Sequence, residues 1–463
     1  MSTLTTRDVL NITGGTAHHI TQLDEVLTTA IYDSREAQEG SLFLAIEGTK
    51  TDGHLFAGDA VSRGARLVLA SRPVSHPCVV VADVISAITL LAQENRKRIN
   101  CPVLAITGSS GKTSTKDLLI DLLQPLGDLV APAGSRNNEL GLPSTLFAAN
   151  RDTAAVILEM GARHKGNIAQ LCEIAQPTIA GITTIGSAHI GEFGSLELIA
   201  ETKGEIIANL PSTAIAVLNA DEVPTRKLSE TTLARVVLAG YSSEAEIRLT
   251  EVVLDQKAHP TISVETPLGR LRAKLNLVGE HQAMNAAIAI GMALAAGIPV
   301  DTLEARLESA HPRSPLRMQV FVSQRDVTVL NDSYNANPES MLAALETLKH
   351  LAESSRSFAV LGEMAELGDI SVLEHQKLGR AIAELNISRF IGVGAGLKVS
   401  VESAIEHGMN PTIATWVSTQ EEALQILRHE LKSRDVVLVK ASRAAGFDHI
   451  AALLAAQDQA GGE

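Results

Sequence analysis

A glycine-rich stretch at residues 103–115, V-L-A-I-T-G-S-S-G-K-T-S-T, carries the strongest chemical signal of the sequence. An apolar run breaks into a glycine loop, and a Lys-Thr pair then begins a segment with helical periodicity. Backbone N–H groups of such a loop, together with the dipole of the following helix, form a cradle for phosphate. We expect Lys112 to contact the terminal phosphates and Thr113 to hold Mg²⁺ through its hydroxyl. The residues expected to contact the nucleotide phosphates are Gly108, Ser109, Ser110, Gly111, Lys112, Thr113 and Ser114.

The spacing of this loop narrows the class of protein. The usual G-x-x-x-x-G-K-[ST] pattern would require glycine at position 106, where this chain has Ile106. The shorter T-G-x-x-G-K-T form points away from most kinases and GTPases. An ordinary glycine-containing turn is the alternative, although such a turn would not require the Lys-Thr pair in register with both glycines.

Three further residues have types suited to a metal site beside this loop. Glu159 ends the apolar run A-A-V-I-L-E, and a carboxylate at the carboxyl end of a parallel strand is suited to hold Mg²⁺. His189 also follows an apolar run, and Lys203 lies in a later segment with helical periodicity. Each residue has an ordinary alternative: a glutamate at a helix start, a loop histidine and a solvated lysine.

Paired polar residues elsewhere could bind a sugar, a phosphate or a base. Asn137 and Asn138 carry amides that hydrogen-bond such oxygens, but asparagines also form turns. His281 and Asn285 are four residues apart at the start of an alanine-rich segment, so they share one helix face. They could hold a base ring, and a helix cap with a buried asparagine is the alternative.

The last third of the chain supplies a second group of polar residues. Arg317 would neutralise charge on a transferred phosphoryl group, and Asp332 would bind a ribose or order a metal-bound water. The string D-S-Y-N-A-N-P is too specific for a plain turn, and K-A-S-R follows a predicted strand at the end where ligands bind. The candidates for substrate contact here are Tyr334, Asn335, Asn337, Lys440, Ser442 and Arg443.

The apolar runs predict an α/β protein in three sections, residues 1–100, 101–313 and 314–463. In the middle section strands alternate with helices, which predicts a doubly wound parallel sheet with a small antiparallel extension. The turn-like string H-P-R-S-P at 311–315 marks the last boundary. The expected strands are 41–46, 67–70, 78–81, 103–106, 154–159, 179–184, 214–218, 247–253, 261–264, 358–361, 390–393 and 436–439. The expected helices include 57–64, 85–99 and 283–296, the last of which closes the middle section.

The composition limits the classes of function. A chain of 463 residues with 45% hydrophobic residues is long enough for several cores. A net charge of −14 and 3% aromatic residues argue against broad nucleic-acid binding. Three cysteines without C-x-x-C spacing indicate buried thiols in a reducing cytosol. The N-terminus has no signal pattern and the longest apolar stretch is too short to span a bilayer, so we expect a soluble, cytoplasmic protein.

Several strings, in the same order, resemble the Mur ligase family of peptidoglycan synthesis. They are T-G-S-S-G-K-T, N-N-E-L-G-L-P, E-M-G-A, A-H-I-G-E-F-G-S-L-E-L-I-A-E-T-K-G-E-I, D-S-Y-N-A-N-P, G-E-M-A-E-L-G and V-L-V-K-A-S-R, with D-S-R, G-S-L-F-L-A-I-E-G and D-G-H-x-F in the first section. The resemblance covers nearly the whole chain. It implies an N-terminal domain that binds a UDP-sugar, a central P-loop ATPase-like domain with a parallel sheet, and a C-terminal Rossmann-like domain that closes over ATP and binds the incoming amine.

The resemblance also implies a reaction. In this family ATP phosphorylates a substrate carboxylate to an acyl phosphate, and an amine then displaces phosphate to form an amide. The strings are most similar to those of the member whose substrates are UDP-N-acetylmuramoyl-tripeptide and D-Ala-D-Ala. The chain would then be an ATP-dependent carboxylate–amine ligase of cell-wall synthesis, monomeric, and linked to cell shape and division.

By the same resemblance, Thr113 and Glu159 hold one Mg²⁺ ion, and His189 and Lys203 serve a second. The lysine at the Lys203 position is usually carbamylated in the family, which turns a cation into an anionic oxygen ligand. Lys112, Lys203, His189 and Arg317 are the implied catalytic residues. The other implied contacts are His281 and Asn285 with adenine, Asp332 and Arg317 with ribose and γ-phosphate, Asn138 with substrate or phosphate, and Ser34 and Arg35 with the uridine diphosphate.

Some features depart from the family pattern and some alternatives stay open. Ser135 and Gln282 stand where relatives often have Asn, and Thr202 stands where a small residue is usual. A Mur ligase that adds diaminopimelate or lysine to the dipeptide usually carries a D-N-P-R string, which this sequence lacks. Folylpolyglutamate synthase lacks a first domain like residues 1–100. A non-catalytic nucleotide-binding relative would not need the metal-binding residues Thr113, Glu159, His189 and Lys203, which we call the metal set. The sequence does not distinguish diaminopimelate from lysine as the third residue of the tripeptide.

Overall fold

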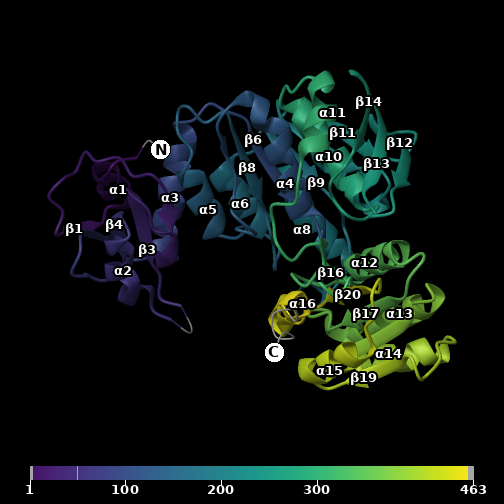
Figure 1. Ribbon diagram of the computed structural model, residues 1–463. Helices are drawn as coiled ribbons and strands as arrows, with labels where there is room; N and C mark the ends of the chain where they lie inside the picture. The colour runs from purple at the N-terminus through teal and green to yellow at the C-terminus, as the bar shows by residue number, and fades with distance from the viewer. Residues whose placement is uncertain (1–3, 49–50, 457–463) are drawn as a thin grey trace.

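The computed structural model describes residues 4–48 and 51–456, and within them the chain forms three sheets that follow one another along the sequence. Residues 1–3, 49–50 and 457–463, which belong to the expected first and third sections, lie outside the described residues. Figure 1 shows three sheet-containing units, with the first and third attached to the central one. We call them the first unit (residues 4–98), the central unit (residues 101–309) and the third unit (residues 319–456). The expected three-part α/β fold is confirmed, whereas the domain boundaries stay predictions.

The first unit packs three α-helices around a five-stranded sheet. Its elements are α1 (Thr6–Thr13), β1 (Thr16–His18), β2 (Ala30–Ile31), η1 (Ser34–Glu36), β3 (Ser41–Ala45), η2 (Gly53–Phe56), α2 (Ala57–Ser62), β4 (Ala65–Ala70), β5 (Cys78–Val80) and α3 (Val84–Lys97). The strand order is β1-β5-β4-β3-β2, with β1 antiparallel and the other pairs parallel. All five residues of β3 are buried, which explains why this strand is apolar on both faces.

The central unit is built on a nine-stranded sheet of order β14-β13-β12-β11-β10-β9-β6-β8-β7. Its elements are β6 (Val103–Thr107), α4 (Lys112–Leu123), η3 (Gln124–Leu126), β7 (Leu129–Val130), α5 (Gly141–Phe147), β8 (Ala155–Glu159), α6 (Asn167–Ala175), β9 (Ile179–Ile182), α7 (Ile190–Phe193), α8 (Leu196–Ala208), β10 (Ile215–Asn219), α9 (Val223–Leu228), η4 (Ser229–Thr231), β11 (Arg235–Gly240), β12 (Ile247–Leu254), β13 (Pro260–Thr266), β14 (Gly269–Lys274), α10 (Gln282–Ala295) and α11 (Val300–Ser309). Strands β6 to β12 pair in parallel, and β12, β13 and β14 form the expected antiparallel extension.

Helices cover both faces of this central sheet. One apolar cluster joins the sheet to α4, α10 and α11, and a second joins it to α5, α6 and α8. This is the doubly wound arrangement that the alternating pattern predicts. The prediction that an alanine-rich helix closes the section was wrong, because α11 follows α10 and packs in the same cluster. The sequence of α11, V-D-T-L-E-A-R-L-E-S, buries only Leu303 and Leu307 and so carries a weak apolar signal.

The third unit has a six-stranded sheet of order β15-β16-β20-β17-β18-β19. Its elements are β15 (Gln319–Val322), β16 (Thr328–Asn331), α12 (Pro338–Leu351), β17 (Ser357–Leu361), η5 (Gly368–Ile370), α13 (Ser371–Glu384), β18 (Arg389–Val393), α14 (Leu397–Glu406), β19 (Ala414–Val417), α15 (Gln420–Glu430), β20 (Val436–Lys440), η6 (Arg443–Ala445) and α16 (Asp448–Ala456). Only β15 pairs antiparallel. Helices α12, α13 and α14 share one apolar cluster, and α15 and α16 share another, so this sheet is also covered on both faces.

Buried contacts join the first unit to the central unit. Asn95 on α3 is fully buried and its side-chain amide donates to the carbonyl oxygens of Leu146, Phe147 and Ala149 at 3.0, 3.2 and 2.7 Å. These carbonyls lie at the end of α5, where a helix leaves such groups without helical partners. The Phe147 side chain packs in the apolar cluster of the first unit. The orientation of α3 is therefore set by the central unit as well as by its own sheet.

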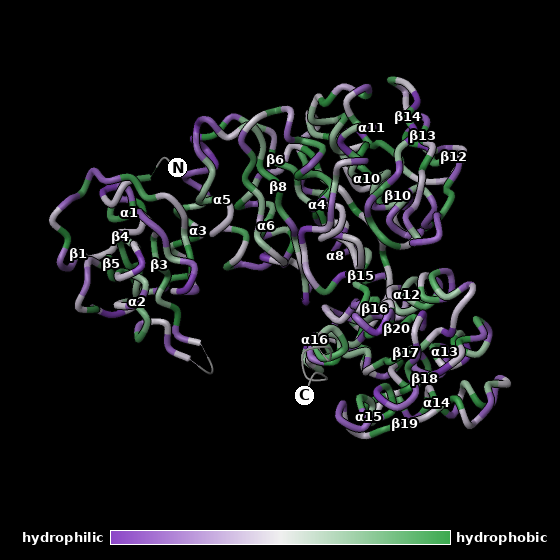
Figure 2. The backbone as a smooth tube through the Cα atoms, viewed as in Figure 1, coloured by the Kyte–Doolittle hydropathy of each residue, from purple (hydrophilic) through white to green (hydrophobic). Residues whose placement is uncertain are grey.

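Hydropathy follows this architecture. Figure 2 shows hydrophobic segments gathered along the strands inside each unit and hydrophilic segments in the connecting loops. Within residues 4–48 and 51–456, no helix is both long and apolar enough to cross a membrane.

Candidate active site

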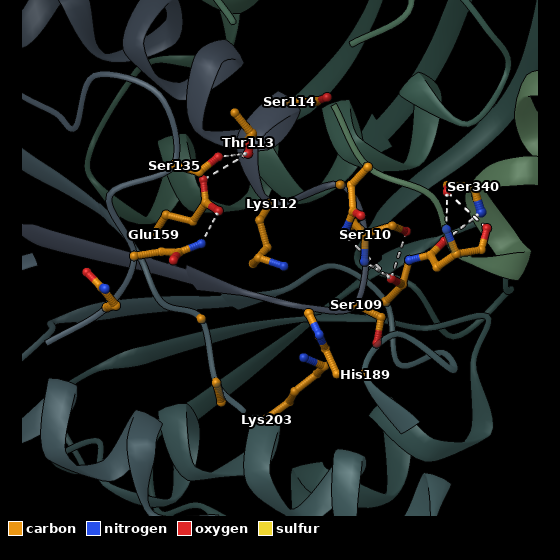
Figure 3. Close-up of a pocket in the computed structure, with 18 of the residues that line it drawn as sticks. Ser109, Ser110, Lys112, Thr113, Ser114, Ser135, Glu159, His189, Lys203 and Ser340 are labelled. Atoms are coloured by element: carbon orange, nitrogen blue, oxygen red, sulfur yellow. Dashed lines mark hydrogen bonds between the residues drawn. The ribbon is translucent and has the colours of Figure 1, made fainter. Parts of the chain in front are cut away.

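A cavity of about 1020 Å³ lies where the central unit meets segments of the other two units. The phosphate loop, the loops after β8 and β9, and the start of the third unit all contribute to its wall. Figure 3 shows part of this wall. The predicted site residues that line the cavity are Ser109, Ser110, Gly111, Lys112, Thr113, Ser114, Asn137, Asn138, Glu159, His189, Lys203, His281, Asn285, Arg317, Asp332, Tyr334, Asn335, Asn337 and Lys440.

The glycine loop follows β6 and ends where α4 begins at Lys112. Gly108 and Gly111 have φ values of 151° and 82°, which residues with side chains rarely adopt. A Cβ atom on Gly111 would also lie 2.3 Å from Oδ1 of Asn285. Lys112 folds back, and its ammonium donates to the Gly108 carbonyl at 2.6 Å. Both glycines are therefore required by the shape of the loop, as its sequence predicts.

Hydrogen bonds fix the loop to the end of β9. Ser109 N donates to the Thr184 carbonyl at 2.8 Å, and Ser110 N donates to Thr184 Oγ1 at 3.1 Å. The Ser109 hydroxyl donates to the Gly186 carbonyl at 2.9 Å. The strand expected at 179–184 ends at Ile182, because the residues after it contact the loop instead of extending the sheet. The serine side chains thus position the loop in addition to any contact with phosphate.

Oxygen-bearing side chains gather at the start of α4. The Thr113 hydroxyl donates to Oε2 of Glu159 at 2.9 Å and lies 3.4 Å from the Ser135 hydroxyl. The Asn137 amide donates to the other Glu159 oxygen at 2.9 Å. Figure 3 shows Thr113, Ser135 and Glu159 turned toward one another. Hydroxyl and carboxylate oxygens of this kind suit a hard divalent cation, so Thr113 and Glu159 fit Mg²⁺.

Lys203 on α8 is 3% exposed, yet no carboxylate among the described residues forms an ion pair with it. Burial of an unpaired ammonium is unfavourable. Burial, together with the positive charge of Lys112, lowers the pKa of Lys203 to about 7. A large part of this residue is therefore an uncharged, nucleophilic amine at neutral pH.

His189 precedes α7 and has a positive φ of 64°. Its imidazole Nδ1 lies against the carboxylate of Glu366, which belongs to the third unit. Burial lowers the pKa of His189, Glu366 opposes this shift, and Lys112 and Lys203 reinforce it. Figure 3 shows the side-chain ends of Lys112, His189 and Lys203 directed into the same space.

No group of three or more His, Cys, Asp or Glu side chains suited to a metal occurs in the described part of the chain. A metal at this site would therefore depend on other oxygen ligands. Those available are the Thr113 hydroxyl, phosphate oxygens, and any oxygen that Lys203 gains by modification. The site fits metal ions that bind together with a nucleotide better than a resident ion held by protein alone.

The opposite side of the phosphate loop carries the pair predicted to hold a base. His281 lies immediately before α10, and burial lowers its pKa to about 4. The ring Nε2 lies 3.1 Å from the side-chain nitrogen of Gln282, and the Asn285 amide donates to Gln282 Oε1 at 2.9 Å. Asn285 is 4% exposed and lies against Gly111. Gln282, which sequence reasoning treated only as a departure, joins the two predicted residues.

The start of the third section supplies a cation and a carboxylate. The Arg317 guanidinium lies 3.9 Å from the centre of the Tyr334 ring and donates to the Ser135 hydroxyl at 3.1 Å. Asp332 accepts from Met318 N at 3.0 Å. The Lys440 ammonium binds the other Asp332 oxygen at 2.5 Å and donates to the Asn335 carbonyl at 2.8 Å. Lys440 thus holds Asp332 and the loop that carries Tyr334 in place.

Several predicted residues have local partners or lie away from the cavity. Ser34 donates to Asp59 and Arg35 pairs with Asp33, both within the first unit. The Ser442 hydroxyl accepts from Ala365 N, and Arg443 pairs with Asp448 at 3.5 Å. Asn337 lines the cavity but also caps α12, where its side chain accepts from Ser340 N at 2.9 Å. The roles predicted for Ser34, Arg35, Asn337, Ser442 and Arg443 stay predictions.

Contacts between the central and third units hold the loop after β9. The Glu339 carboxylate on α12 accepts from both the backbone N and the hydroxyl of Ser187, at 2.8 and 3.0 Å. Glu222 accepts from Ile185 N at 2.8 Å, and burial together with the charge of Glu339 raises its pKa to about 7. This loop leads directly to His189. No motif marked these glutamates, because their partners are distant in sequence.

Family models for the Mur ligases match three parts of the chain. They are described as "Mur ligase family, catalytic domain" at residues 28–106, "Mur ligase middle domain" at residues 106–293, and "Mur ligase, glutamate ligase domain" at residues 316–443.

Individual relatives match along the whole chain. A UDP-N-acetylmuramoyl-tripeptide--D-alanyl-D-alanine ligase of Mycobacterium tuberculosis is 41% identical, with 100% of this chain and 99% of that protein covered. The crystal structure of MurF from Acinetobacter baumannii is 30% identical and superposes with a TM-score of 0.83, over 98% of each chain. MurF ligase from Thermotoga maritima in complex with ADP is 28% identical with a TM-score of 0.79, over 93% of this chain and 97% of that one.

Proposed function

This chain belongs to the Mur ligase family, and we propose that it joins D-Ala-D-Ala to UDP-N-acetylmuramoyl-tripeptide in an ATP-dependent reaction. The products would be the pentapeptide precursor, ADP and phosphate. The observation that carries the proposal is the 41% identity, over the full length of both chains, to a ligase named for these two substrates. The cavity supports it, since phosphate-binding, cationic and carboxylate groups from different units line one space.

Each section of the chain has a proposed part in this reaction. Residues 1–100 would bind the UDP-sugar, with Ser34 and Arg35 at the uridine diphosphate. Residues 101–313 would bind ATP. Residues 314–463 would close over the nucleotide and bind the incoming amine. We place the reaction in the cytoplasm with the precursor, on a monomeric enzyme.

The chemistry requires positive charge, because a carboxylate must attack an anionic γ-phosphate. Lys112 and Arg317 would supply this charge from opposite sides of the cavity. The tripeptide carboxylate oxygen attacks phosphorus and ADP leaves, which gives an acyl phosphate. The amine of D-Ala-D-Ala then attacks the carbonyl carbon, the C–O bond to phosphate breaks, and an amide forms.

The metal set rests on the residues around the phosphate loop. Thr113 and Glu159 would hold one Mg²⁺, which supplies charge neutralisation at the phosphates when bound. His189 and a carbamylated Lys203 would serve a second. Carbamylation needs an uncharged amine, and the lowered pKa of Lys203, about 7, supports this modification. The modification would also give this buried side chain the anionic oxygens that a metal binds.

The nucleotide would lie between the central and third units. Asn285 and His281 would contact adenine, and Asp332 would contact the ribose, held in place by Lys440. Arg317, fixed by Tyr334 and Ser135, would reach the γ-phosphate. Asn137 and Asn138 would contact the substrate or phosphate.

Two other functions are less well supported. A Mur ligase that adds diaminopimelate or lysine to the dipeptide would share the fold, but the full-length similarity is to a D-alanyl-D-alanine ligase. A nucleotide-binding protein without catalysis would not need a buried, unpaired Lys203 beside Lys112 and His189. Both alternatives make different predictions in the same assay.

The test is phosphate release from ATP in the presence of Mg²⁺ and UDP-N-acetylmuramoyl-tripeptide, with and without D-Ala-D-Ala. We expect phosphate release to require D-Ala-D-Ala. We also expect a product with the mass of the pentapeptide precursor. If phosphate release instead requires UDP-N-acetylmuramoyl-dipeptide with diaminopimelate or lysine, the family's chemistry is retained and the proposed substrates are wrong. If no amine supports release, the non-catalytic alternative is correct.

A further inference from the structure

The cavity extends beyond the phosphate loop, toward the first unit. Thr89 and Gln93 on α3 and Gln170 on α6 line this extension, together with the turn that follows β8. Arg163 belongs to this turn and lines the cavity. No phosphate, metal or nucleotide role proposed above uses Arg163.

The position of Arg163 is fixed by its backbone. The backbone N–H groups of Arg163 and His164 both donate to Oδ1 of Asn167, at 3.1 and 2.9 Å. Arg163 lies four positions after Glu159 of the metal set, so their Cα atoms are at most ~14 Å apart. The backbone of Arg163 is therefore fixed by this turn, and its exposed side chain lines the cavity close in sequence to the metal set.

Arg163 has no anionic partner within the described part of the chain, although the net charge is −14. Glu139 and Glu173 also line the cavity, yet neither pairs with it. Lys165, two residues further along the same turn, pairs with Glu201 at 2.8 Å and does not line the cavity. The other arginine of the cavity wall, Arg317, likewise has no carboxylate partner among the described residues, and it is assigned to an anionic group of the substrate.

A guanidinium presents a planar set of donors that matches a carboxylate, and an unpaired one in a cavity suits an anionic ligand. In the proposed reaction, Lys112 and the metal set already serve the reacting carboxylate. We propose that Arg163 determines specificity by binding a second, non-reacting carboxylate of the peptide arm. This inference rests on the proposed function. A diaminopimelate residue carries such a carboxylate on its side chain and a lysine residue does not, so the favoured substrate is the diaminopimelate tripeptide.

The test compares pentapeptide formation from the diaminopimelate and lysine forms of UDP-N-acetylmuramoyl-tripeptide. We expect the native enzyme to prefer the diaminopimelate form. Arg163→Met should raise its KM for that form about tenfold or more, with kcat and the KM for ATP nearly unchanged. Arg163→Lys, which keeps the charge but not the planar donors, should be intermediate. Lys165→Met is the matched control and should behave as the native enzyme.

The comparison of the two substrates shows which carboxylate Arg163 binds. If Arg163→Met weakens only the diaminopimelate form, the side-chain carboxylate is the ligand. An equal loss with both forms would overturn the specificity role, because a carboxylate that the two substrates share cannot distinguish them. Unchanged KM values for both forms, in an active enzyme, would overturn the role of Arg163 alone. No pentapeptide from either form with the native enzyme would instead overturn the proposed function, and the inference with it.

Discussion

Three lysines line the cavity, and their different partners give them different proposed roles. Lys112 folds onto the Gly108 carbonyl, Lys440 binds Asp332, and Lys203 has no carboxylate partner in the described part of the chain. Lys440 therefore positions Asp332, and its predicted contact with substrate stays a prediction. Burial lowers the pKa of both Lys112 and Lys203, and Lys203, with a pKa of about 7, is the one proposed for modification.

Replacing Lys203 tests the metal set. Lys203→Ala should lower kcat about 100-fold or more, because the variant cannot form the carbamate that is proposed to bind the second metal ion. A small carboxylate such as acetate should restore part of the activity by occupying the vacated space. The measurement is the rate of phosphate release with and without acetate. Full activity of the variant would remove Lys203 and its carbamate from the mechanism.

His281 gives a prediction about pH and stability. Its folded pKa of about 4 lies below the ordinary value of about 6.5. The unfolded chain therefore takes up a proton as pH falls through 6.5, while the folded chain does so only near 4. The free energy of unfolding should fall across this window by at most about 3 kcal/mol. His281→Gln should flatten this part of the curve of melting temperature against pH, whereas the exposed-site variant His429→Gln should retain it.

Which site residues could be predicted depended on whether they lie in a recognisable string. Lys112, Thr113 and Glu159 were placed correctly at one cavity from local sequence alone. Ser135 was not assigned a role, because its contact with Arg317 joins positions 182 residues apart. Arg163 belongs to no recognisable motif, and only its place in the cavity wall identifies it as a candidate.

At the scale of elements, fully buried strands were predicted well, whereas the shortest strands and the most exposed strand were missed. β6, β8 and β17 are buried at every position and apolar at all but one terminal residue each, so their runs are visible in the sequence. The two-residue strands β2 and β7 are too short for any periodicity, and β15 is mostly exposed. Strand pairing supplies what these segments lack in apolar pattern.

Asn337 separates a structural role from a substrate role. Its side chain caps α12 in a reciprocal arrangement with Ser340, so Asn337→Ala should lower stability by about 1 kcal/mol. Asn337→Ser preserves the cap and removes the amide. If Asn337 serves only the helix, the serine variant should match the native enzyme in both melting temperature and KM. A raised KM at unchanged melting temperature would instead establish the predicted substrate contact.

At the scale of the molecule, one short segment of the central unit contacts both the first unit and the residues that lead into the third unit. Ser135 binds Arg317, and Asn137 binds Glu159 in the central unit. Between them, Arg136 pairs with Glu36 of the first unit and lies over the Tyr32 ring, 5.3 Å from its centre. The residue that contacts the first unit is therefore adjacent in sequence to Ser135 and Asn137, which line the cavity.

Removing the Arg136 contacts should loosen the first unit. Arg136→Ala should raise the KM for the tripeptide substrate roughly fivefold and leave the KM for ATP unchanged. Small-angle X-ray scattering should show a larger radius of gyration. Arg7→Ala, which breaks an exposed ion pair with Asp24 inside the first unit, is the control and should change neither quantity. A matching change in the control would mean that Arg136 has no particular role between units.

The proposed ligase activates the tripeptide carboxylate by phosphorylation. The most direct measurement uses UDP-N-acetylmuramoyl-tripeptide with ¹⁸O in its terminal carboxylate, together with ATP, Mg²⁺ and D-Ala-D-Ala. Because the C–O bond breaks when the amine attacks, the released phosphate should carry one ¹⁸O atom for each pentapeptide formed. Pentapeptide with unlabelled phosphate, or no pentapeptide at all, would contradict the account.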